Sequence, residues 1–261
     1  MSTPQTQQHS SMFIDRTSAT VPYMKFLKFI IALLLLPATV ALTKTLYALT
    51  MQQADLSHPL FSPLTYGLVS GLLLLLILPN PIRTYVLGHE LTHALWGLCM
   101  GARVGKINVT KKGGHVELSK TNFLITLAPY FFPFYTILII ALYAIGNLFT
   151  DLHPYHNLFL FLVGITWAFH LHFTLHMLAN RHQPDITEQG RLFSYTIIYS
   201  FNLITLMIWM ICVGSLTLRE TRHQLTHDLH NSYHWTTQKI ETGIQKLEQY
   251  QRWQRWKNII P

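Results

Sequence analysis

Two histidines and a glutamate stand within the apolar stretch YVLGHELTHALWG, residues 85–97. His89 and His93 are four residues apart, so both side chains would emerge from one face of an α-helix, with Glu90 about 100° round from His89. In this HExxH pattern, two neutral imidazoles bind Zn²⁺ and the glutamate takes the proton of a water that attacks a carbonyl group. The spacing predicts a zinc site with hydrolytic chemistry, in which His89 and His93 are ligands and Glu90 is the general base.

The surroundings of these three side chains strengthen the metal interpretation. Ionisable groups in apolar sequence cost free energy if they are buried without a partner. A bound cation would stabilise both imidazoles and the carboxylate together. In the alternative interpretation the two histidines hydrogen-bond across a helix bundle, which leaves Glu90 without a partner.

The composition is that of a membrane protein. Half of the 261 residues are hydrophobic and 11% are charged, against about 25% charged residues in typical soluble domains. The formal charge of +8 comes from Lys and Arg at segment ends and in loops, without a basic stripe interleaved with aromatics. We therefore expect contact with the lipid bilayer and no binding of nucleic acid.

The apolar runs predict an all-α polytopic protein with five to six transmembrane helices. Pro79 and Pro81 divide one long run into two helical parts, because proline interrupts a helix. The loop after Met100 is rich in Lys and Arg, which places it on the cytoplasmic side. The expected membrane helices lie at about 29–49, 64–78 joined to 82–100, 122–148, 157–179 and 192–216.

A short β-hairpin is expected in the basic loop, at the membrane face. The loop reads VGKINVTKKGGHVELS, in which two β-prone runs flank a Lys-Lys-Gly-Gly sequence. Gly113 and Gly114 can adopt the positive φ angles of a tight turn, so we expect the chain to reverse there.

The stretch GHELTHALWGLCMGARV, residues 88–104, resembles the first motif of the site-2-protease-type intramembrane zinc metalloproteases. In that family HExxH lies in a membrane helix and is followed by small residues and a Gly-x-Val turn. LAPY, residues 127–130, is similar to the Ala-Gly-Pro signature of the next helix, with Ala128 in place of glycine. The resemblance covers about residues 64–200 and implies a protease that hydrolyses peptide bonds in or beside the membrane.

The resemblance also indicates where a third zinc ligand should lie. The family uses an aspartate in a motif of the form Asn-x-x-Pro-(x)-Leu-Asp-Gly, and the comparable stretch here is NRHQPDITEQGRLFSY. It retains Asn180 and Pro184 but has no Asp-Gly pair. Asp185 is the first choice for the ligand and Glu188 the alternative, while Asn180 could bind the substrate backbone or the oxyanion.

Histidines elsewhere offer further alternatives. His172 and His176 share one face of a predicted membrane helix, and could ligate the metal or support its ligands. In the tail, His223, His227, His230 and His234 also share a face. A solvated helical surface explains that row most simply, with metal capture as the alternative.

The resulting prediction has three parts: a disordered leader (1–22), a membrane metalloprotease-like domain (23–216) and a polar, amphipathic helical tail (217–261). We expect a multi-pass protein, placed in a bacterial inner membrane, that uses Zn²⁺ to cleave membrane protein or peptide substrates. The alternatives are a noncatalytic pseudoprotease that binds membrane helices and a histidine-lined metal transporter.

Overall fold

The computed structural model describes residues 22–52, 61–110, 113–179, 183–212 and 216–257. The predicted leader therefore lies outside the described residues except for Pro22. The chain divides into two compact units. Unit 1 combines residues 1–29 with 55–202, and unit 2 combines residues 30–54 with 203–261.

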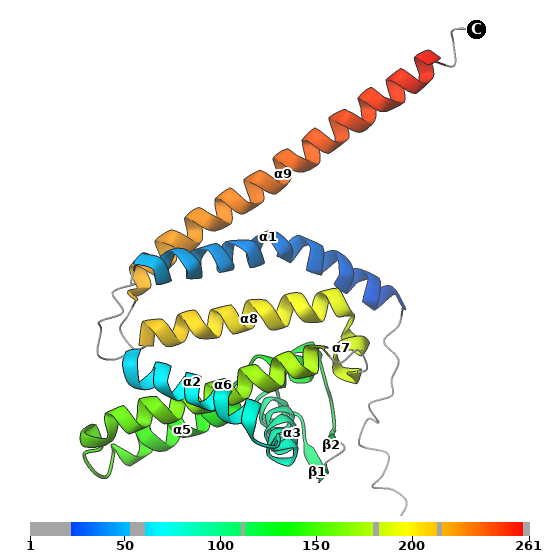
Figure 1. Ribbon diagram of the computed structural model, residues 1–261. Helices are drawn as coiled ribbons and strands as arrows, with labels where there is room; N and C mark the ends of the chain where they lie inside the picture. Colours follow the sequence, from blue (N-terminus) through cyan, green and yellow to red (C-terminus); the bar gives the residue numbers. More distant parts are fainter. Residues whose placement is uncertain (1–21, 53–60, 111–112, 180–182, 213–215, 258–261) are drawn as a thin grey trace, which may run out of the picture. The chain divides into compact units, whose positions relative to one another are not determined.

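The described chain is mostly helical, as predicted (Figure 1). Within the described ranges, three helices are long and apolar enough to cross a membrane, or four if a bent pair counts as one span. The elements in chain order are α1 (Pro22–Gln52), α2 (Phe61–Ile77), α3 (Ile82–Cys99), β1 (Val104–Thr110), β2 (Gly113–Leu118), α4 (Phe123–Leu127), η2 (Ala128–Tyr130), α5 (Phe134–Gly146), η3 (His153–Tyr155), α6 (His156–Ala179), α7 (Pro184–Gln189), α8 (Arg191–Cys212) and α9 (Leu218–Lys257).

The predicted break between α2 and α3 is confirmed. α2 ends at Ile77 and α3 begins at Ile82, directly after Pro81. Proline has no backbone N–H to donate and its ring disfavours a helical conformation in the preceding residue. The HExxH residues therefore belong to a separate helix of 18 residues.

The helix expected over residues 122–148 is instead divided. The segment Phe123–Tyr130 and helix α5 meet at an angle of 82°. The break falls at Pro133, which directly precedes α5 and lacks the N–H that a continuous helix would need. Because of this bend, η2 (Ala128–Tyr130) lies beside α3 and does not continue into α5.

Small residues allow α2 and α6 to pack closely in unit 1. A Cβ atom added at Gly71 would lie 2.8 Å from the Cβ of Ala168, and one added at Gly67 would strike the backbone oxygen of Phe161. Such small-residue contacts let helix backbones approach one another in membrane proteins. This packing helps to position α6 in unit 1.

The predicted hairpin is present. β1 and β2 are antiparallel, and Thr110 pairs with Gly113 while Ile107 pairs with Val116. Gly113 has the expected positive φ, at 146°, whereas Gly114 pairs with Val109 inside β2 instead of lying in the turn. Buried Val116 and Leu118 hold β2 against α3.

Unit 2 contains the predicted helical tail as one 40-residue helix, α9. Its start is a capping box, in which the N–H of Glu220 donates to Thr217 Oγ1 and the N–H of Thr217 donates to the Glu220 carboxylate. Thr45 Oγ1 on α1 donates to the buried Asp228 Oδ2 on α9 at 2.8 Å. α9 is therefore anchored to α1 near its own N-terminal end.

Candidate metal centre

Helix α3 places the three HExxH side chains differently with respect to solvent. His93 is fully buried, Glu90 is 3% exposed and the side chain of His89 is 11% exposed. A fourth polar residue of the helix, Thr92, is buried, but its hydroxyl donates to the carbonyl of Gly88 one turn earlier. The helix thus directs its chemically useful groups inward in unit 1.

Three potential ligand atoms converge at this point. His89 Nε2 and His93 Nε2 are 3.2 Å apart, and the Asp185 Oδ2 atom is 3.3 Å from the first and 3.5 Å from the second. A tetrahedral zinc ion bound at about 2.0–2.1 Å requires neighbouring ligand atoms about 3.3–3.4 Å apart. The spacing of the three donors therefore fits a zinc-sized ion, and among the described residues this group could hold a metal.

The hydrogen bond of His93 determines which of its nitrogens can bind. Nδ1 lies 2.8 Å from the carbonyl oxygen of Ile125, which can only accept, so Nδ1 carries the proton. In the neutral ring Nε2 then presents a lone pair toward the Asp185 carboxylate, which is also an acceptor. A cation held between these two acceptors would remove their repulsion, and histidine ligands in metal sites are commonly oriented in this way.

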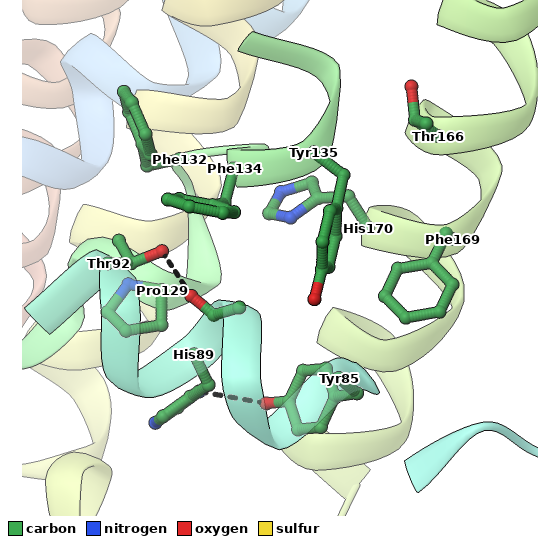
Figure 2. Close-up of a pocket in the computed structure, with 11 residues that line it drawn as sticks. Tyr85, His89, Thr92, Pro129, Phe132, Phe134, Tyr135, Thr166, Phe169 and His170 are labelled. Atoms are coloured by element: carbon green, nitrogen blue, oxygen red, sulfur yellow. Dashed lines mark hydrogen bonds between the residues drawn. The ribbon is translucent and has the colours of Figure 1, made fainter. Parts of the chain in front are cut away.

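Two tyrosine hydroxyls contact the other two candidate ligands, His89 and Asp185. The Tyr85 hydroxyl lies 3.0 Å from His89 Nδ1 (Figure 2), and its ring stacks on Phe173 at 4.6 Å between centroids. Tyr130, which is fully buried, donates to Asp185 Oδ2 at 3.3 Å. Sequence reasoning missed both. Tyr85 could have been found because it precedes His89 by four residues, whereas Tyr130 has no local signal.

Asp185 is the carboxylate that the fold brings to the histidines. It lies in the first turn of α7 and is 5% exposed. Burial by itself would raise the pKa of Asp185, but the neighbouring imidazoles of His89 and His93 lower it well below its usual value. The carboxylate is therefore ionised at neutral pH, as a metal ligand must be.

Glu90 has an unusual environment for a buried carboxylate. Its Oε2 atom is buried and has no hydrogen-bond partner among the residues that the structure describes. A Cβ atom added at Gly114 would lie 2.5 Å from Glu90 Cγ and 2.7 Å from its Oε1, so the start of β2 lies directly against this side chain. The second residue of β2 must be glycine for Glu90 to keep its position.

The other predicted site residues do not join the metal group. Glu188 is partly exposed on α7, and His176 is exposed on α6. His172 has a buried Nε2 atom without a hydrogen-bond partner, but among the described residues it is not one of the three that converge. Asn180 lies outside the described residues.

A small cavity adjoins the metal centre beside Tyr85 and His89 (Figure 2). Its volume is about 30 Å³, enough for one or two water molecules. His170 also lines it and contacts the Asn202 side chain at 3.4 Å. The cavity is mostly aromatic, so it is a packing feature around α3 rather than a second polar site.

No protein-family model, curated protein or solved structure matches this chain. The function must therefore be inferred from the motif and from the geometry of the metal centre.

Proposed function

We propose that this protein is an intramembrane zinc metalloprotease of the site-2-protease type. The observation that carries the proposal is the set of three donors, His89, His93 and Asp185, separated by 3.2 to 3.5 Å. Glu90, next to His89 on the same helix, adds a buried carboxylate oxygen that no hydrogen-bond donor in the described part of the chain reaches. This combination is what hydrolysis of a peptide bond by an activated water requires.

Each residue has a defined task in this proposal. Zinc, when bound, supplies Lewis-acid polarisation and lowers the pKa of water. Glu90 accepts the proton of the attacking water and returns it to the amine that leaves. The Tyr85 hydroxyl orients the His89 imidazole and the Ile125 carbonyl orients that of His93. Both contacts use Nδ1, so the Nε2 atoms of the two histidines remain available for the metal.

The substrate class follows from the environment of the site. The described residues contain three helices able to cross a membrane, or four with the bent pair. Five crossings result if α2 with α3 also spans it as one bent unit, and six if α2 and α3 are counted separately. A membrane-embedded substrate must unwind locally, because an intact helix uses its carbonyl groups in hydrogen bonds. We assign membrane-embedded or membrane-adjacent peptides as substrates, with the hairpin offering an edge strand to an extended segment.

The test compares four full-length proteins in liposomes: the wild type, Glu90→Gln, His93→Ala and the control Glu117→Gln. Zinc content is measured by mass spectrometry of the metal, and cleavage is measured on synthetic single-span peptides with glycine-rich centres. Glu90→Gln should keep its zinc and lose at least about 100-fold in cleavage rate, since it removes the general base. His93→Ala should lose both, and Glu117→Gln on β2 is the matched control that should lose neither.

Other outcomes would point to the competing functions. If the wild type binds zinc but cleaves the peptides no faster than Glu90→Gln does, the protein is a noncatalytic helix-binding protein. If zinc enters liposomes that contain a zinc-sensitive dye, and His93→Ala stops the entry, the centre belongs to a transporter. Either result would overturn the protease proposal.

A further inference from the structure

Four histidines lie along one face of α9, in unit 2, and none of them contributes to the proposed protease. They are His223, His227, His230 and His234, and all four are exposed. Asp228 and Ser232 lie on a different face of α9 and are 7% and 4% exposed. The histidine row therefore faces away from the surface that holds α9 to α1.

We propose that His230 and His234 form a second metal site, which binds one divalent cation of the Zn²⁺, Ni²⁺ and Cu²⁺ class. Their rings are nearly parallel, at 18°, and their centroids are 6.1 Å apart. Since an imidazole centroid lies about 3.2 Å from a metal on Nε2, two rings on one ion with ligand angles of about 90–110° have centroids about 4.5–5.2 Å apart. The exposed rings of His230 and His234 therefore need to turn about 1 Å toward each other to share an ion, which their position on one helix face allows. Neutral imidazole nitrogen is a preferred ligand for these three cations.

The side chains around the row favour this pair over the pair nearer to the start of α9. Arg219 and Arg222, both exposed, flank His223 and would repel a cation. The ring nitrogens of His227 already have two neighbours, because Asn231 Nδ2 lies 3.1 and 3.3 Å from them and Asp228 Oδ1 lies 3.6 Å from Nδ1. The first pair is therefore less suited to hold an ion.

The residues that follow His234 on the same face add an oxygen donor and a negative charge. Gln238 comes one turn later and can offer a carbonyl oxygen, and Glu241 comes two turns later and adds a negative charge to this surface. Water molecules would fill the other coordination positions. With two protein nitrogens and no buried carboxylate, the site should bind at least ~100-fold more weakly than the buried centre.

The experiment is a titration of the full-length protein in liposomes with Ni²⁺, followed by calorimetry, and with Cu²⁺, followed by quenching of tryptophan fluorescence. Trp235 directly follows His234, so an ion on this pair should quench it. The buried centre is silenced in one series by His93→Ala, and in a second series by filling the wild type with one equivalent of Zn²⁺ beforehand. The second series keeps the test valid if His93→Ala does not fold.

We expect one equivalent of Ni²⁺ to bind in both series. His230→Ala and His234→Ala should each weaken that binding at least tenfold and reduce the Cu²⁺ quenching, while the control His223→Ala should change it less than twofold. Circular dichroism should show unchanged helix content, since all three positions are exposed. The proposal is overturned if no Ni²⁺ binds, if the double variant of His230 and His234 binds as well as the parent, or if His223→Ala weakens binding as much as His234→Ala.

Discussion

Among the histidine pairs with a spacing of four residues, the pair His89 and His93 on α3 and the pair His230 and His234 on α9 differ most in their surroundings. On α3 the rings of His89 and His93 are 4.8 Å apart at 80°, and their Nε2 atoms lie 3.2 Å from each other. On α9 the rings of His230 and His234 are 6.1 Å apart and nearly parallel. Identical spacing on a helix thus leads to a closed arrangement in one place and an open one in the other.

The difference comes from what surrounds each pair. The α3 pair is buried, and it meets a carboxylate from α7, a backbone carbonyl and a tyrosine hydroxyl. Those partners orient the rings, and buried polar groups of this kind are costly unless they are satisfied. The α9 pair is exposed, so water can satisfy its nitrogens in any rotamer. Spacing supplies a pair of donors, but tertiary neighbours turn the pair into an organised centre.

Removing one histidine of the buried pair should have the largest effect on zinc binding. His93→Ala should weaken zinc binding by about 1,000-fold, because two ligands of a chelating group remain and a third is lost. Competition with a fluorescent zinc chelator measures this. His172→Ala on α6 is the matched control, and an equal loss there would mean that the metal lies elsewhere.

The choice between the two acidic residues of α7 gives the next largest effect. Asp185→Asn should weaken zinc binding by about 100-fold, since the amide oxygen carries no charge to offset that of the ion. Glu188→Gln should have almost no effect, because Glu188 is not among the converging donors. The same chelator assay decides between them, and the reverse result would make Glu188 the ligand.

A substitution on the hairpin separates catalysis from metal binding. In Gly114→Ala the added Cβ would overlap Glu90, so the carboxylate must move, and we expect about a tenfold to 100-fold loss of kcat. Zinc content should stay constant. His115→Ala, at the next and exposed position of β2, is the control. An unchanged kcat in Gly114→Ala would show that Glu90 does not need its present position.

The supporting tyrosine should have a smaller effect. Tyr130→Phe removes the hydroxyl that donates to Asp185 and should weaken zinc binding by about tenfold, at the lower end of what such partners contribute. Tyr155→Phe, on an exposed tyrosine of the η3 turn, is a suitable control. Equal zinc affinities for Tyr130→Phe and the wild type would show that α7 alone holds the carboxylate.

The smallest expected effect is on Ni²⁺ binding by the exposed pair on α9. Gln238→Glu would give the exposed pair a carboxylate one turn from His234, and Ni²⁺ binding should tighten by about threefold to tenfold. Calorimetry on the zinc-filled protein measures it. Gln254→Glu, near the far end of the same helix, should leave the affinity unchanged. If both variants behave alike, the gain reflects net charge rather than coordination.

Several features could be predicted from the sequence because they depend on local periodicity and on proline. Two side chains four residues apart share a helix face wherever the helix lies, so the pairing of His89 with His93 needed no tertiary information. The break before α3 followed from Pro79 and Pro81, and the tail helix followed from a long polar stretch without proline. The two strands of the hairpin and the positive φ of Gly113 were also predicted correctly, whereas Gly114 was expected in the turn and pairs inside β2.

The sequence by itself determined the donors that lie close along the chain: two imidazoles and a glutamate on one helix, and a row of histidines on another. Only the tertiary structure brought Asp185, 96 residues after His89, to the pair in place of Glu188, and laid Gly114 against Glu90. The physical reason is that backbone geometry sets the direction of neighbouring side chains. Contacts between distant segments instead depend on how the helices bend and pack, as the 82° break before α5 illustrates.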